Sequence, residues 1–192
     1  MKEKIFNDET KQTLTYFGPV LNTHTKLSKY TQKDKHKEQN DLLNNIDYVA
    51  IKDGILSEQQ NFQNKVLKII EKSKQNNSYE YLQVKCYGHV FFLCIHGDKI
   101  LLIDSLDLDI RSILGYNYID INCKDFFQKN DIIFKSLTME QQTSGIGCPV
   151  FTVCNLIKVD KFFKENLDYF DKIFDTEIEE DGMKILPLFP LL

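Results

Sequence analysis

The sequence predicts an α+β domain whose central mixed β-sheet is flanked by helices, and three observations support this. First, three short runs rich in branched and aromatic residues follow one another at 81–86, 90–95 and 100–103. Second, apolar residues recur at helical spacing before these runs, and further segments with a helical pattern follow them near the end of the chain. Third, 42% hydrophobic and 27% charged residues is ordinary globular composition.

The first long helix is expected to begin at Ser57-Glu58-Gln59-Gln60, which has the spacing of a capping box. Apolar residues then recur at helical spacing to about Ser73, at Phe62, Val66, Ile69 and Ile70. This pattern predicts an amphipathic helix that packs one face on the domain.

The second and third apolar runs predict a β-hairpin that turns at His96-Gly97-Asp98. Both faces of the hairpin are apolar, so helices are expected to cover the sheet on both sides. Further elements are predicted along the rest of the chain: strands at 118–123 and 131–137, a short helix at 108–114, and helices at 149–158 and 160–175.

Residues 22–41 are nearly all polar and cannot bury enough surface to offset the entropy lost on ordering. They divide the chain into an N-terminal extension with a polar linker, residues 1–41, and a main domain, residues 42–192. The net charge of −4 and isoelectric point near 5.6 argue against a general nucleic-acid binder.

The five cysteines show neither a disulfide framework nor a C-x-x-C zinc pattern, which indicates a reducing compartment and no metal or cofactor site. The N-terminus has no apolar signal core, and no run reaches membrane-spanning length. We therefore expect a soluble intracellular protein. No pattern predicts its oligomeric state.

Cys148 occupies a position that suits a thiol nucleophile. It follows the flexible loop of Gly145 and Gly147 and precedes Pro149, which fits the first turn of a helix. Unpaired N–H groups at a helix N-terminus favour the thiolate, which is the reactive form. A cysteine alone is more often structural, but three companion residues favour catalysis here.

These companions are His89, Asp104 and Gln142. His89 begins one strand of the hairpin and Asp104 ends the other, so the antiparallel pairing is expected to bring them together. The carboxylate would then orient the imidazole that serves as base. The amide of Gln142, with the Cys148 backbone N–H, would stabilise the oxyanion of a tetrahedral intermediate.

In this order, His, Asp, Gln and Cys resemble the clan CE cysteine proteases, which process ubiquitin-like modifiers. The matching motifs are H-x-F-F-L from His89, I-D-S-L over 103–106 and Q-Q-x-x-G-x-G-C over 141–148. The resemblance covers about residues 80–160. It implies a fold of the papain-like superfamily, of the ubiquitin-like-protease type, with the nucleophile at a helix N-terminus.

The resemblance also implies roles for the residues. Cys148 would be the nucleophile, His89 the base, Asp104 its orienter and Gln142 the oxyanion donor, in a catalytic domain over 42–192. The expected partners are ubiquitin or a ubiquitin-like modifier and its conjugates. The Lys-, Asn- and Ile-rich composition is typical of AT-rich genomes, as in many intracellular bacteria, and fits an effector delivered into host cytoplasm without a cleaved signal.

Two alternatives remain open at this stage. Effector-type acetyltransferases use the same order of residues with acetyl-CoA, although their acid is typically Glu. A degenerate protease would keep only its modifier-binding surface. Gly147 and Pro149 motivate this second alternative, because the family usually has Asp-Cys-Gly at the nucleophile.

Overall fold

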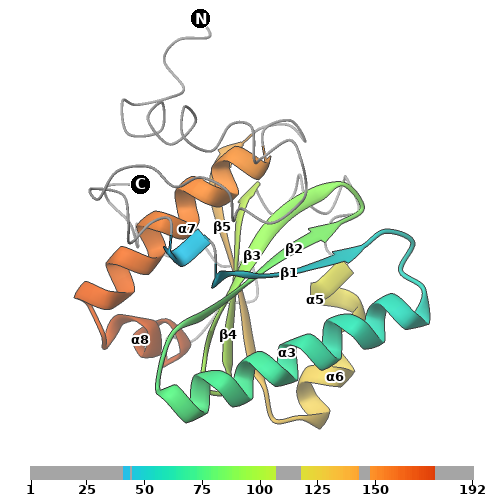
Figure 1. Ribbon diagram of the computed structural model, residues 1–192, viewed down its shortest axis with the longest axis horizontal. Coiled ribbons are helices and arrows are strands. Elements are labelled where there is room, and N and C mark those ends of the chain that lie inside the picture. Colours follow the sequence, from blue (N-terminus) through green and yellow to red (C-terminus); the bar gives the residue numbers. More distant parts are fainter. Residues whose placement is uncertain (1–40, 44, 107–117, 143–147, 176–192) are drawn as a thin grey trace, which may run out of the picture.

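The computed structural model describes residues 41–43, 45–106, 118–142 and 148–175, with the backbone alone at 120, 138–142 and 148–150 (Figure 1). In these residues the chain forms one five-stranded sheet in the order β1-β2-β3-β4-β5. Its strands are β1 (Asp47–Ile51), β2 (Glu80–Cys86), β3 (His89–His96), β4 (Lys99–Leu106) and β5 (Ile133–Gln142). The fold is therefore α+β with a mixed sheet, as predicted.

The directions of the strands bring the C-terminal ends of four strands and the start of the fifth to the same end of the sheet. The pairs β2–β3 and β3–β4 are antiparallel, whereas β1–β2 and β4–β5 are parallel. Strands β1, β2, β4 and β5 therefore all finish at the end of the sheet where β3 begins. We call this the His89 end.

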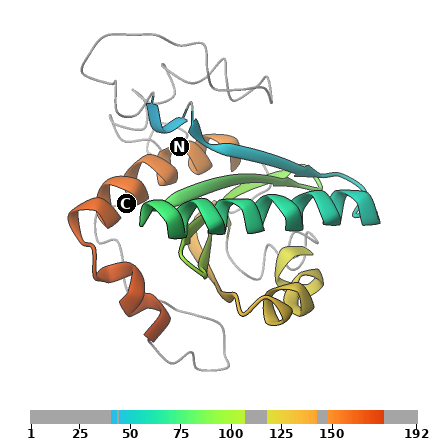
Figure 2. The ribbon, with the colours of Figure 1, turned by 60° about the horizontal axis from the view of Figure 1, so that its bottom comes forward.

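Helices cover both faces of the sheet, which confirms the prediction from the two apolar faces of the hairpin (Figure 1). One face packs against α3 (Leu56–Asn76), α5 (Tyr118–Asn122) and α6 (Lys124–Lys129). The other packs against α7 (Cys148–Glu165) and α8 (Tyr169–Asp175). Figure 2 shows the sheet lying between α3 and α7.

Helix α3 is present, and its predicted inward residues Phe62, Val66, Ile69 and Ile70 are buried. The predicted capping box is wrong. The N-cap is Ile55, which makes no side-chain cap. Glu58 instead turns back to the β1–α3 loop, where its carboxylate accepts hydrogen bonds from the backbone N–H groups of Lys52, Asp53 and Gly54 at 3.0–3.1 Å.

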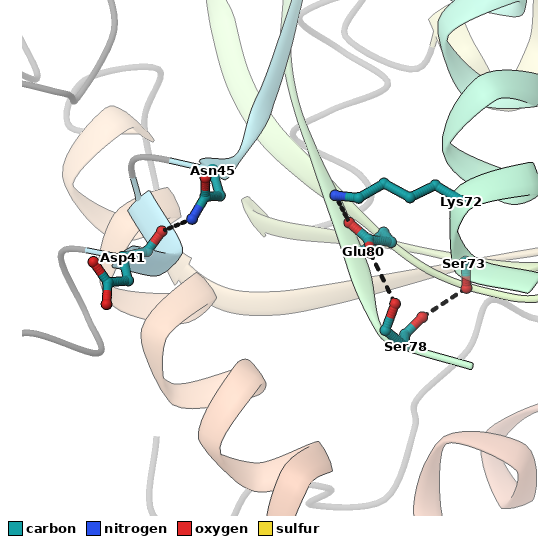
Figure 3. Close-up of polar contacts among 6 residues, drawn as sticks. All are labelled: Asp41, Asn45, Lys72, Ser73, Ser78 and Glu80. Carbon is teal, nitrogen blue, oxygen red and sulfur yellow. Dashed lines mark hydrogen bonds and ion pairs between the residues drawn. The ribbon is translucent and has the colours of Figure 1, made fainter. Parts of the chain in front are cut away.

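The C-terminal end of α3 is tied to the sheet by a group of polar contacts (Figure 3). Ser73 Oγ donates to the Ser78 carbonyl at 2.6 Å and accepts from the Gly97 N–H in the β3–β4 turn at 2.9 Å. Glu80 accepts from Lys72 at 2.6 Å and from the Ser78 hydroxyl at 2.8 Å. These bonds fix the far end of the hairpin, opposite the His89 end.

Two expectations about secondary structure are wrong. Residues 118–123 were expected to form a strand, but Tyr118–Asn122 form the helix α5, with Ile119 packed in the core and Ile121 exposed. Tertiary packing here outweighs β-propensity. The helices expected at 149–158 and 160–175 are instead one continuous helix to Glu165, followed by α8 from Tyr169.

The sequence did not predict β1, whose five residues pair with β2 in parallel. Two further expectations lie outside the described residues: the extension at 1–41, apart from residue 41, and the helix at 108–114. Within the part of the chain that the structure describes, no helix combines the length and the apolar character needed to cross a membrane.

Candidate active site

His89 and Asp104 form a buried hydrogen-bonded pair, as the hairpin geometry predicted. His89 Nε2 lies 2.8 Å from each carboxylate oxygen of Asp104, and each residue is only 1% exposed. A carboxylate can only accept, so the ring donates through Nε2–H. Proton exchange with a nucleophile would therefore take place at the other ring nitrogen, Nδ1.

A backbone hydrogen bond also holds the acid of this pair. Asp104 Oδ1 accepts from the Leu106 N–H at 3.0 Å. This bond fixes the carboxylate independently of the imidazole. Held in this way, the carboxylate is placed to orient the histidine and to stabilise its cation.

The pair lies on the sheet face that α3, α5 and α6 cover. His89 is on the same side of β3 as Phe91, and the two ring centroids are 5.9 Å apart. Across the β2–β3 hairpin, His89 is directly opposite Cys86, which belongs to the core of that face. The imidazole is thus packed as well as hydrogen-bonded, which restricts its orientation.

Thr152 fixes the first turns of α7 against the start of β3. Its hydroxyl donates to the Val90 carbonyl at 2.8 Å, and the bond is buried. Val90 is the residue after His89. Helix α7 packs on the opposite face of the sheet, but this bond anchors its N-terminal end beside the His89 end.

Cys148 is the first residue of α7, one helical turn before Thr152. At a rise of 1.5 Å per residue, its backbone lies about 6 Å from that of Thr152 along the helix axis. The predicted start of a helix at Cys148 is therefore present. The Thr152 bond ties the helical turn that follows Cys148 to the strand that carries the histidine.

Gln142 is the last residue of β5 and pairs in register with Leu106, two residues after Asp104. The register of β4 and β5 shifts between Asp104 and Leu106, so β5 holds two extra residues there. Such bulges are frequent beside active sites, where they redirect the strand. Here the irregularity immediately precedes the segment that leads to Cys148.

The backbone of all four predicted site residues thus converges on the His89 end of the sheet. His89 and Asp104 are in direct contact, and Gln142 and Cys148 are brought to the same end by β5 and α7. Gly145 and Gly147, which were expected to form the open loop, lie outside the described residues.

The structure also describes four other cysteines, all of them buried: Cys86, Cys94, Cys123 and Cys154. Burial raises the pKa of the Cys94 thiol well above its ordinary value, although a hydrogen bond with Tyr81 opposes this. A buried thiol of this kind stays protonated and unreactive. The described residues also contain no cluster of three His, Cys, Asp or Glu side chains arranged to bind a metal ion.

Sequence reasoning missed two supports of the site, Thr152 and the β5 bulge. Thr152 is a polar residue one turn after the cysteine, in an otherwise apolar stretch of helix, and that position was its only signal. The bulge had no signal, because it depends on the pairing of β5 with β4.

Comparison with protein-family models gave no match to this chain, and comparison with curated proteins gave none either.

Proposed function

We propose that this chain is a cysteine hydrolase with Cys148 as nucleophile, His89 as base and Asp104 as orienting acid. The observation that carries the proposal is the buried His89–Asp104 contact, at the end of the sheet where α7 begins with a cysteine. A buried carboxylate partner favours the imidazolium, and a helix N-terminus favours the thiolate, so the two features support the two members of a thiolate–imidazolium couple.

In the proposed reaction, His89 Nδ1 accepts the proton of the Cys148 thiol. The thiolate attacks the substrate carbonyl carbon, a C–S bond forms, and the carbonyl oxygen becomes an oxyanion held by the Gln142 amide and the Cys148 backbone N–H. As the C–N bond breaks, the imidazolium returns its proton to the leaving amine. A water molecule, deprotonated by His89, then hydrolyses the thioester and regenerates the thiol.

Asp104 acts on the imidazole throughout this cycle. Its contact with Nε2 fixes the tautomer in which Nδ1 can accept a proton, and its charge stabilises the imidazolium that forms. The Leu106 N–H keeps the carboxylate in place as the histidine gains and loses its proton. Thr152 maintains the distance between the start of α7 and the histidine strand.

The proposed substrates are conjugates of ubiquitin or a ubiquitin-like modifier, cleaved at an isopeptide bond. The motifs around His89, Asp104 and Cys148 that resemble clan CE proteases support this substrate class. A free Cys148 thiol requires a reducing compartment, which agrees with the cysteine usage of the chain.

A panel of fluorogenic modifier conjugates, each with a C-terminal amide, tests the proposal. We expect turnover of at least one conjugate by the wild-type chain and none by Cys148→Ala. His89→Ala should lower turnover at least 10³-fold, since it removes the base. Tight binding of a modifier without turnover would refute hydrolysis in favour of a binding module. Stable acetylation of Cys148 by labelled acetyl-CoA, without cleavage of any conjugate, would support acetyl transfer instead.

A further inference from the structure

The β2–β3 turn, just before His89, has an unusual residue for its backbone. Cys86 pairs with His89, so Tyr87 and Gly88 form a two-residue turn, and their φ angles are 50° and 93°. A turn with two positive φ angles favours Asn, Asp or Gly at its first position. A bulky aromatic residue there is strained, because its Cβ crowds the backbone.

Packing holds Tyr87 in this conformation. Its N–H donates to the Ile51 carbonyl at 3.0 Å, and its ring meets that of Tyr118 edge-on, with centroids 5.6 Å apart. The hydroxyl lies over Gly54, where an added Cβ would overlap it. Gly54 itself has φ +67°, so the close approach and the backbone both favour glycine.

The loop beneath Tyr87 is also fixed. The Glu58 carboxylate holds three successive backbone N–H groups of this loop, and the Gln59 side chain donates to the Gly54 carbonyl at 3.0 Å. The Tyr87 ring therefore rests on a rigid support. Even so, the residue remains 41% exposed, at the same end of the sheet as the candidate base.

Strained residues that the surrounding structure holds in place occur preferentially at functional sites. Asn would satisfy this turn with less strain, yet the chain places a partly exposed tyrosine two residues before His89. A ring held in one orientation loses little entropy when it binds, and tyrosine is enriched among residues that dominate protein recognition.

We propose that Tyr87 is a specificity-determining residue, whose partly exposed side chain packs against an apolar side chain of the protein substrate beside the scissile bond. This inference rests on the proposed hydrolase activity. The partner chemistry is an apolar surface on a folded protein substrate, because the exposed Ile55 and Leu56, 55% and 69% exposed, continue the apolar character beyond Gly54.

The test compares Tyr87→Asn, which relieves the turn and removes the ring, with Tyr87→Phe, which keeps the ring. Each is assayed for kcat and KM on the best modifier conjugate, and for the pH dependence of Cys148 alkylation by iodoacetamide. We expect Tyr87→Asn to lower kcat/KM about 10-fold through KM, a loss typical of a buried interface contact. Tyr87→Phe should retain most of the wild-type kcat/KM, and alkylation should follow the wild-type profile in both.

Ile133→Thr is the matched control. Ile133 is 47% exposed and pairs in register with Lys99, at the far end of the sheet from His89. Its replacement removes a similar exposed apolar group from the same sheet. We expect kcat/KM of this variant to stay within about 2-fold of the wild type.

Three outcomes would overturn the inference. Unchanged kcat/KM in Tyr87→Asn would exclude contact between the ring and the substrate. A loss in kcat with a shifted alkylation profile would make Tyr87 a positioning residue for His89 instead. A wild-type chain that cleaves no conjugate would remove the proposed hydrolase function and this inference with it. If the wild type is active, either of the first two outcomes would remove this inference alone.

Discussion

Replacing Asp104 with Asn tests the role of the buried pair, because it removes the charge and one acceptor oxygen while the side chain keeps its size. The amide oxygen can still accept from the Leu106 N–H, which now bonds Oδ1. The amide nitrogen then faces His89 Nε2, which lies 2.8 Å from both oxygens in the native protein. Two donors cannot bond each other, so the ring is expected to carry its proton on Nδ1 instead. In that tautomer Nδ1 cannot accept the thiol proton.

The electrostatic part of the loss can be worked from the geometry. Contacts of 2.8 Å from Nε2 to both oxygens correspond to charge centres about 4 Å apart. At an effective dielectric constant of about 20, that separation gives an attraction of about 4 kcal/mol for the imidazolium. This is about a 10³-fold change in the population of the thiolate–imidazolium couple.

We therefore expect Asp104→Asn to lower kcat about 10³-fold and to move the pH midpoint of Cys148 alkylation upward. The assay is the rate of iodoacetamide alkylation between pH 5 and 10, beside conjugate cleavage and thermal unfolding. Asp160→Asn is the control, because Asp160 is also a buried acid, paired with Lys164 at 2.7 Å within α7. Its alkylation profile should match the wild type. An unchanged profile and a kcat within 2-fold in Asp104→Asn would refute the reasoning.

Three further predictions follow from the contacts around the site. Thr152→Val should lower the free energy of unfolding by about 1–3 kcal/mol and slow Cys148 alkylation, whereas Thr152→Ser, which keeps the hydroxyl, should do neither. Equal stabilities of Thr152→Val and the wild type in urea unfolding would contradict this. Gly54→Ala should lower the free energy of unfolding by at least about 1–2 kcal/mol from the positive φ alone. Adding Tyr87→Phe should remove the overlap between the new Cβ and the Tyr87 hydroxyl but not the backbone strain, so a double variant whose loss is the simple sum of the two single losses would exclude that overlap. Burial raises the pKa of the Glu58 carboxyl, but the backbone hydrogen bonds that it accepts outweigh burial and lower this pKa below its ordinary value of about 4.5. The stability that these bonds contribute is therefore present above about pH 4.5 and is lost as the pH falls through the lowered pKa. The difference in melting temperature between wild type and Glu58→Gln should accordingly shrink from pH 6 to pH 3, and a constant difference would count against it.

The hairpin and its pair could be predicted from the sequence because the determining signals are local. Two apolar runs flank Gly97-Asp98, and antiparallel pairing fixes which residues at their far ends meet. His89 and Asp104 therefore came together as expected. Their catalytic role, and those of Cys148 and Gln142, stay predictions.

The errors arose where tertiary contacts decide the structure. Residues 118–123 carry β-branched side chains, but Tyr118 packs against Tyr87 and the segment winds into α5. Ser57 and Gln60 had the spacing of a capping box, yet Glu58 finds three backbone donors in the preceding loop. Neither contact can be read from the order of residues alone, because each depends on a neighbouring segment folded against it.

The most direct test of the central claim is to map the covalent adduct formed by a ubiquitin or ubiquitin-like probe with a C-terminal electrophile. Peptide mass spectrometry of the labelled chain should locate the adduct on Cys148, and His89→Ala should abolish or strongly slow its formation. Attachment to another cysteine, or labelling of Cys148 at the same rate without His89, would contradict the proposed site.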